Sequence, residues 1–191
     1  MTNCMRLCKT PFGIAICGAN GCGKTTLGMT LSKELSIRYM DIEQYYFDNG
    51  IRPYSNSRSR DEVVKLIQRD ISKYDEFIIS AVNCNLGEEI NKCYRLVAYM
   101  YAPLEVRMER IKNRSYQQFG KRVQMGGDLY EQEQSFFEFV RNESERKIEE
   151  TVAWINTLST PVLQIDGTKP IKENVKEIIK QIMKGKGERA K

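Results

Sequence analysis

The stretch GANGCGKTT, residues 18–26, decides the fold that we predict for this chain. It follows the run FGIAIC (12–17), which is short, apolar and ended by a glycine, as expected of a buried strand. After it, Leu27, Leu31 and Leu35 recur at the spacing of an amphipathic helix. A glycine-rich segment that suits neither element therefore connects a strand to a helix.

Within this segment, Gly18-x-x-x-x-Gly23-Lys24-Thr25 has the spacing of a phosphate-binding loop, the P-loop. Glycines allow successive backbone N–H groups to turn inward around phosphate oxygens. Lys24 adds a positive charge near the β- and γ-phosphates, Thr25 offers its hydroxyl to Mg²⁺, and the helix N-terminus contributes a favourable dipole. The predicted triphosphate contacts are Gly18, Ala19, Asn20, Gly21, Cys22, Gly23, Lys24, Thr25 and Thr26.

Short apolar runs and helical patterns alternate along the rest of the chain. Further strands are expected in IRYM (37–40) up to Asp41, EFIISAV (76–82), YRLVAYMY (94–101) and VLQID (162–166). Five short strands separated by helices predict a three-layer α/β fold, in which a five-stranded parallel sheet is flanked by helices. No repeat or low-complexity linker interrupts the chain, so a single domain over residues 1–191 is expected.

Local signals also predict two helix starts and one irregular segment. Ser59 and Glu62 have the spacing of a capping box, and Asp128 with Glu131 can cap a long helix. Before that second start, helical periodicity fails over residues 115–127, which are basic and end in two glycines. We expect this segment to be a mobile flap.

Composition excludes several classes of site and of protein. The chain has no histidine, which excludes a catalytic imidazole base, and its six cysteines form no C-x-x-C pair, so we expect buried, reduced thiols. No apolar run approaches the roughly 20 residues of a membrane span. Because the N-terminal residues lack the apolar stretch of a secretory signal, a cytoplasmic location is expected. Much of the net charge of +5 lies in the C-terminal KGKGERAK, so we do not expect a nucleic acid or a membrane as partner.

Two further segments resemble a known family. ERIKNR (109–114), after the fourth expected strand, and DGTKP (166–170), after the fifth, resemble segments of the adenylate kinase family and, together with the P-loop, follow its order. The resemblance implies a P-loop kinase of the nucleoside and nucleotide kinase superfamily, which uses ATP and Mg²⁺. It also implies that residues 115–127 form the mobile lid that closes over ATP. It covers the nucleotide-binding core well and the acceptor region poorly.

The same resemblance implies roles for three arginines and one loop. Arg110 would lie against the adenine face. Arg114, one helical turn further on, would reach the phosphates in the transition state, with Arg107 as an assistant. Gly167, Thr168 and Lys169 would border the adenine from the other side. Arginines at this spacing are also typical of a solvated helix face, and the sequence leaves that alternative open.

The segment after the third expected strand departs from the adenylate kinase pattern. Adenylate kinases carry Asp-Gly-Phe-Pro-Arg there, whereas this chain has SAVNCNLGEE (80–89), with Ser80 in the place of a strand-end acid for Mg²⁺. The candidate acid is Asp41, because strand ends border the ligand crevice in such sheets. As in kinases that resemble shikimate kinase, it would orient the acceptor hydroxyl, take its proton or hold a metal-bound water. The alternatives are that Asp41 is a helix or turn cap and Glu43 a surface charge.

A cluster of arginines lies between the second strand and the following helix. Arg52, Arg58 and Arg60 surround Tyr54 in an acceptor-side insertion over about residues 42–60. An anionic acceptor, with a phosphate or carboxylate group, would explain this clustering. A plain basic surface loop would explain it equally well.

The sequence therefore supports one leading function and two alternatives. The leading one is an ATP-dependent, Mg²⁺-requiring kinase of a nucleotide or another small, anionic metabolite, with Lys24, Asp41, Arg107 and Arg114 as catalytic residues. The first alternative is a nucleotide-binding regulatory ATPase without a small-molecule acceptor. The second, supported only by charge, is an NTPase associated with nucleic acid. Neither the acceptor nor the oligomeric state follows from the sequence.

Overall fold

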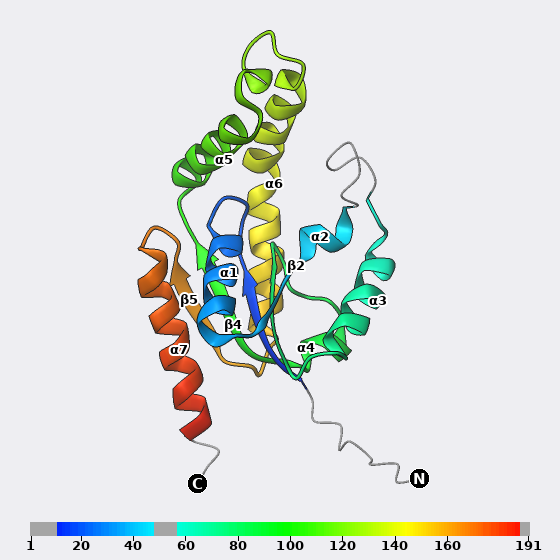
Figure 1. Ribbon diagram of the computed structural model, residues 1–191, viewed down its shortest axis with the longest axis vertical. Helices are drawn as coiled ribbons and strands as arrows, with labels where there is room; N and C mark the ends of the chain where they lie inside the picture. Colours follow the sequence, from blue (N-terminus) through cyan, green and yellow to red (C-terminus); the bar gives the residue numbers. More distant parts are fainter. Residues whose placement is uncertain (1–10, 48–56, 188–191) are drawn as a thin grey trace.

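Five parallel strands form the centre of the molecule. The computed structural model describes residues 11–47 and 57–187. Its strands are β1 (Phe12–Cys17), β2 (Arg38–Asp41), β3 (Glu76–Ala81), β4 (Tyr94–Tyr101) and β5 (Val162–Asp166), and they lie in the order β2-β3-β1-β4-β5 (Figure 1). Every neighbouring pair is parallel. The predicted sheet is therefore confirmed.

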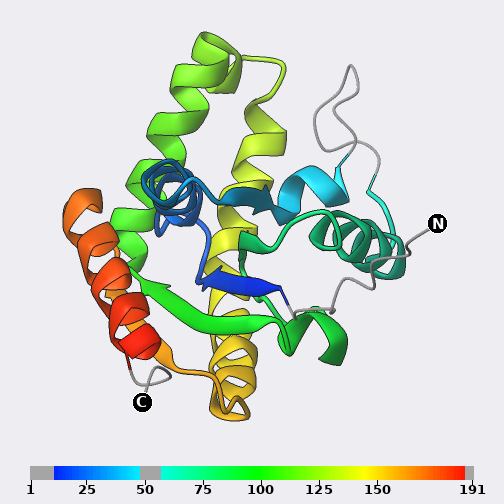
Figure 2. The same cartoon turned by 60° about the horizontal axis from the view of Figure 1, so that its bottom comes forward.

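Helices cover both faces of this sheet (Figure 2). One face carries α1 (Lys24–Leu35) and α7 (Ile171–Gly187), and the other carries α3 (Arg60–Ile71), α4 (Glu88–Asn91) and the C-terminal part of α6 (Tyr130–Asn156). Along β1, Ile14 and Ile16 belong to the apolar cluster under α1 and α7, whereas Ala15 and Cys17 belong to the cluster on the opposite face. A strand that is buried on both faces is apolar at successive positions, which explains the run FGIAIC and confirms the three-layer α/β fold.

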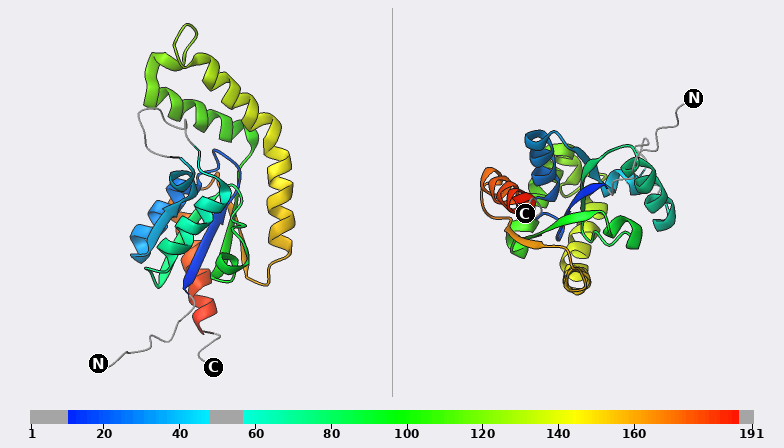
Figure 3. Two further views of the ribbon diagram at one scale, coloured as in Figure 1. Left: turned by 90° about the vertical axis from the view of Figure 1, so that its right-hand side faces the viewer. Right: turned by 90° about the horizontal axis from the view of Figure 1, so that it is seen from below.

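Two helices form an arm above the carboxyl ends of the strands (Figure 3). Helix α5 (Leu104–Phe119) leads outward, the short 3-10 helix η1 (Gly120–Val123) and a turn reverse the chain, and α6 returns to the core. The irregular flap expected over residues 115–127 is therefore partly wrong, because α5 continues to Phe119. The buried Ser115 hydrogen-bonds to Glu133 of α6. The two helices thus meet there through polar side chains, which leave no apolar periodicity in the sequence.

An ion pair closes the turn of the arm. Asp128 accepts hydrogen bonds from two nitrogens of Arg122, with Oδ1 2.9 Å from Nε and Oδ2 2.6 Å from Nη2. The prediction that Asp128 caps α6 is wrong, because α6 begins at Tyr130 without a side-chain cap. The planar guanidinium group of an arginine can bind both oxygens of a carboxylate in this way. Asp128 therefore stabilises the turn of the arm instead of capping α6.

The other helix starts follow the sequence more closely. The capping box of Ser59 and Glu62 is present at the start of α3, as predicted. The short helix α2 (Ile42–Tyr46) was not expected from periodicity, and Asp41 is its N-cap, since the Asp41 side chain accepts a hydrogen bond from the backbone N–H of Glu43. The cap interpretation of Asp41 is thus confirmed.

Helix α6 is one continuous helix of 27 residues that connects the arm to the core. Near its end, the Thr151 hydroxyl donates to the carbonyl of Lys147 at 2.7 Å and lies 3.4 Å from the carbonyl oxygen of Val82, which accepts from the backbone N–H of Gly18 at 3.1 Å. Helix α6 therefore reaches from the turn of the arm to the start of the P-loop. Despite its length it is rich in charge, and no helix in the described ranges is both long and apolar enough to span a membrane.

Candidate active site

The P-loop lies between β1 and α1 and is pressed against β4 and α5. Gly18 has a φ angle of 147° and Gly21 one of 82°. A Cβ atom on Gly18 would lie 2.0 Å from the carbonyl oxygen of Met100, and one on Gly21 would lie 2.6 Å from that of Arg107. Only glycine fits such a close approach of backbone to backbone. The flexible segment is thus held in one defined curve by its neighbours.

Lys24 and Thr25 open α1 directly after this curve. Lys24 is largely buried, and its Nζ atom donates to the carbonyl of Ala19 within the P-loop at 3.0 Å. A phosphate oxygen is the stronger acceptor for an ammonium group and can replace this carbonyl. The structure therefore places the predicted cation inside the concave side of the loop, while Thr25 and Thr26 are exposed on the first turn.

Asp41 of β2 meets the P-loop helix at Thr25. The Thr25 hydroxyl donates to Oδ2 of Asp41 at 3.1 Å, and Oδ1 accepts from the backbone of Glu43 at 3.2 Å. Hydroxyl and carboxylate oxygens are the ligands that Mg²⁺ prefers, and Mg²⁺ at a nucleotide is usually held by one or two such groups together with the phosphates. The described residues contain no group of three or more His, Cys, Asp or Glu that could hold a metal ion. The Thr25 hydroxyl and the Asp41 carboxylate are the kind of oxygen ligands that Mg²⁺ prefers.

The sequence analysis missed Tyr39, which joins Asp41 to the end of β3. Its hydroxyl lies 2.6 Å from the hydroxyl of Ser80 and donates to Oδ2 of Asp41 at 3.2 Å. Burial raises the pKa of the Tyr39 phenol, so this group keeps its proton. Residues two apart on a strand point to the same face, which places Tyr39 beside Asp41, but its contact with Ser80 depends on the pairing of β2 with β3.

Two arginines of α5 hydrogen-bond to the backbone of the P-loop. Arg107 is buried, and it donates to the carbonyl of Ala102 at 3.1 Å and to that of Asn20 at 3.3 Å. Arg110 donates to the carbonyl of Cys22 at 3.3 Å and to that of Gly167 at 3.0 Å. Both guanidinium groups thus hold loop backbone in place.

The remaining predicted residues of the nucleotide side fall in two places. Asp166 accepts from the backbone N–H of Thr168 at 2.8 Å and from its hydroxyl at 2.6 Å, and these bonds lower the pKa of Asp166. A Cβ on Gly167 would lie 2.6 Å from the carbonyl oxygen of Cys22, so this turn, which continues to Lys169, packs against the P-loop. Arg114 is exposed in the outer half of α5, toward the turn of the arm.

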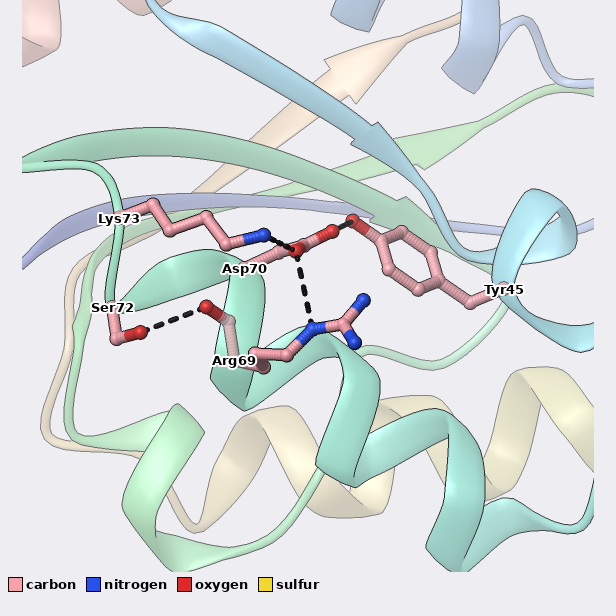
Figure 4. Close-up of polar contacts among 5 residues, drawn as sticks. All are labelled: Tyr45, Arg69, Asp70, Ser72 and Lys73. Carbon is pink, nitrogen blue, oxygen red and sulfur yellow. Dashed lines mark hydrogen bonds and ion pairs between the residues drawn. The ribbon is translucent and has the colours of Figure 1, made fainter.

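On the acceptor side, side chains tie α2 to α3. Figure 4 shows Asp70 of α3 with three partners: it accepts from the Tyr45 hydroxyl at 2.9 Å and from Lys73 at 2.7 Å, and it pairs with Arg69 at 3.8 Å. Arg58 donates to the carbonyl of Tyr45 at 3.0 Å, and Arg60 donates to the carbonyl of Asn85 at 2.9 Å. These two predicted acceptor arginines therefore also support the local backbone, and the third, Arg52, lies outside the described residues.

The expectation of buried thiols is confirmed for the described cysteines. Cys17, Cys22, Cys84 and Cys93 are free and buried. Burial raises the pKa of Cys84 to about 12, and it raises those of Cys17 and Cys93 as well. A buried thiol with a raised pKa is a poor nucleophile, which applies to these three, and all four cysteines are part of the core.

Comparison with known proteins agrees with this geometry. Residues 14–135 match the family described as AAA domain, a stretch that includes the P-loop, Asp41 and α5. The chain is 30% identical over 171 residues to the uncharacterized protein YqaC of Bacillus subtilis (strain 168). The aligned region covers 87% of this chain and 94% of that protein.

Two solved structures have the same fold. A deoxyadenosine kinase from M. mycoides superposes with a TM-score of 0.53 at 17% identity, covering 91% of this chain and 100% of the other. A shikimate kinase from Bacteroides thetaiotaomicron superposes with a TM-score of 0.55 at 12% identity, covering 90% and 98%. At such identities the likeness concerns the fold alone. The chain therefore belongs to the AAA domain family and has the fold of the P-loop kinases.

Proposed function

We propose that this protein is an ATP-dependent, Mg²⁺-requiring phosphotransferase that acts on a nucleotide or another small, anionic metabolite. One observation carries the proposal: the hydrogen bond between Thr25 and Asp41 brings a carboxylate from β2 to the first turn of the P-loop helix. Both solved structures named above are kinases of small molecules. The proposal treats the chain as a single domain in the cytoplasm, within the adenylate kinase-like group.

The triphosphate would lie in the P-loop, where backbone N–H groups and Lys24 face its oxygens. The adenine would lie against Arg110, bordered by the turn of Gly167, Thr168 and Lys169. Support comes from the bonds of Arg110 to both segments, since they bring the guanidinium plane to the boundary between them. Arg107 would act from behind the loop, because its guanidinium donates to the carbonyl of Asn20.

Mg²⁺ would be held by the Thr25 hydroxyl and, directly or through water, by Asp41. When bound, it would neutralise charge on the β- and γ-phosphates. Lys24 would stabilise the same charge from the protein side, and Arg114 would add to it when the arm closes as a lid. The Thr25 hydroxyl can keep its hydrogen on Asp41 while its oxygen lone pair faces the ion, so the bond seen here is compatible with the loaded site.

The acceptor would enter between the ends of β2 and β3. There Asp41, or Glu43 two residues later, would accept the proton of the acceptor hydroxyl. The arginines at positions 52, 58 and 60 would attract an anionic group of the acceptor. A regulatory ATPase without an acceptor is the second candidate, because Ser80 and the segment after it supply neither the acid nor the arginine of the adenylate kinase pattern.

The Lys24→Ala variant tests the proposal. We expect it to lose transfer of labelled phosphate from ATP to every acceptor in a panel of nucleotides and small phosphorylated or carboxylated metabolites, while thermal unfolding stays close to that of the wild type. Lys33→Ala, in the exposed last turn of the same helix, is the matched control and should keep full activity. Equal transfer by Lys24→Ala and wild type would refute the assignment. Hydrolysis of ATP without transfer to any acceptor would favour the regulatory ATPase.

A further inference from the structure

Asp41 is part of a chain of three hydroxyl and carboxyl side chains that crosses two strands. Asp41 and Ser80 are direct neighbours in the parallel register of β2 and β3. Tyr39 spans them, with its hydroxyl 2.6 Å from Ser80 Oγ and 3.2 Å from Asp41 Oδ2. Ser80 is 1% exposed and Asp41 9%, so water contributes little to these bonds. The carboxylate thus has a second donor at Oδ2, the oxygen that also accepts from Thr25.

The ring of Tyr39 is held by the same helix that carries the P-loop. A Cβ atom on Gly28 of α1 would lie 2.3 Å from Cε2 of the Tyr39 ring. The ring therefore packs directly on the helix backbone, and glycine at position 28 makes this approach possible. Because the ring cannot shift toward α1, the position of the hydroxyl is fixed relative to Thr25, three residues earlier on that helix.

The direction of the hydrogen bonds follows from the chemistry of the groups. A carboxylate oxygen only accepts, so Tyr39 donates its single hydrogen to Asp41. The Ser80 hydroxyl then donates to the Tyr39 oxygen. Oδ2 of Asp41 therefore receives two donors, Thr25 and Tyr39.

We propose that Tyr39 and Ser80 are positioning residues that hold the Asp41 carboxylate against Thr25 and thereby set the affinity of the site for magnesium-bound ATP. Ser80 lies near the end of β3, at the place where the adenylate kinase pattern has an acid. Tyr39 connects Ser80 to Asp41, the acid at the end of β2, which serves in its place. The inference rests on the proposed function, since it assumes that ATP binds with Mg²⁺ beside Thr25.

The test compares Tyr39→Phe and Ser80→Ala with the wild type. Calorimetry with ATP is run with and without Mg²⁺, and the ratio of the two dissociation constants is the readout. A hydrogen bond to a charged group is strong enough that its loss should reduce the gain from Mg²⁺ about tenfold in Tyr39→Phe. Ser80→Ala should reduce it by about threefold, because Tyr39 keeps its hydrogen for Asp41. Without Mg²⁺, all three proteins should bind ATP equally. Tyr74→Phe, at the opposite end of β3, is the control and should match the wild type.

The outcomes separate this inference from the proposed function. If the wild type shows no gain in ATP affinity from Mg²⁺, the proposed function itself fails. If the wild type shows the gain and both variants show the same gain, only the inference fails. A lower melting temperature with an unchanged gain identifies a purely structural role and also overturns it. Should Tyr39→Phe not fold, the threefold effect expected for Ser80→Ala decides the question.

Discussion

On the proposed nucleotide side of this site, side chains bind backbone carbonyls, whereas the proposed acceptor side also has bonds between side chains. On the nucleotide side, one guanidinium group binds the carbonyls of Cys22 and Gly167, and glycines let the segments touch. On the acceptor side, the Tyr45 hydroxyl of α2 donates to the carboxylate of Asp70 in α3. A backbone cradle suits a polyphosphate that many enzymes share, whereas side-chain bonds can be exchanged singly as the acceptor differs. This difference explains why a sequence motif covers only one of the two sides.

Two glycine substitutions, one in the P-loop and one outside the site, should give the largest contrast. In Gly18→Ala the new Cβ would lie 2.0 Å from the carbonyl oxygen of Met100, so we expect a loss of more than about 2 kcal/mol in the free energy of unfolding and at least a hundredfold weaker ATP binding. In Gly87→Ala, φ is also positive, at 97°, but nothing lies within 4 Å. Its cost should be about 1–3 kcal/mol, from backbone strain alone. Urea unfolding and calorimetry measure both effects, and equal losses in the two variants would contradict the close-packed loop.

The next largest effect is expected for Asp41, and it should exceed that for Glu43, the other acid between the nucleotide side and the acceptor side. Asp41→Asn should reduce phosphoryl transfer about a hundredfold, because the negative charge beside Thr25 is lost. Glu43→Gln should keep most of the activity, since Glu43 is exposed and contributes only its backbone N–H to Asp41. Steady-state kinetics at saturating Mg²⁺ distinguishes them. A larger effect of Glu43→Gln would make Glu43, not Asp41, the acid that serves the acceptor.

A change confined to the acceptor side should have a smaller effect. Tyr45→Phe keeps the ring and removes the hydrogen bond to Asp70, so the free energy of unfolding should fall by about 1 kcal/mol. ATP binding should be unchanged, because α2 and α3 carry none of the proposed nucleotide contacts. Tyr116→Phe, exposed on the arm, is the control for the substitution itself. Weaker ATP binding in Tyr45→Phe would show that the two sides are not independent.

Acid titration should reveal the weakest of these contacts. The hydrogen bond from Lys73, joined by that from Tyr45, lowers the pKa of Asp70 below its ordinary value of 3.8. The stabilisation from a lowered pKa is present above the ordinary value and is lost as the pH falls through the lowered one. The wild type should therefore exceed Asp70→Asn in stability at pH 7 and pH 5, and the gap should shrink at pH 3. Urea unfolding at the three values checks this, and a gap that grows toward pH 3 would contradict it.

The strands were predictable from the sequence because most of them are buried on both faces, which makes each a short apolar run between polar segments. The helices that escaped prediction are α2 and α4, of five and four residues. A helix shorter than two turns shows no apolar periodicity. The end of α5 escaped for another reason, since Ser115 meets α6 through a hydrogen bond.

Within the site, the P-loop was predictable because its chemistry depends on spacing along the chain. Tyr39 was not recognised, since its partner Ser80 lies 41 positions away and the two meet only through the pairing of β2 with β3. At Asp41 the sequence left two alternatives: the structure confirms the cap of α2, and the bond from Thr25 supports the catalytic role that we propose. A single side chain with two oxygens can serve both purposes.

Helix α6 runs without a break from the turn of the arm to the P-loop, so the arm can act as a lever that pivots beside the P-loop. At 1.5 Å per residue, the helix measures about 32 Å from Thr151 to its first residue, Tyr130. A tilt of about 5° at Thr151, whose hydroxyl lies near the carbonyl of Val82 that accepts from Gly18, displaces Tyr130 by about 2.8 Å. Small adjustments of the loop around a ligand are therefore amplified at the turn of the arm, so a fluorescent label in place of the exposed Met125 would report them.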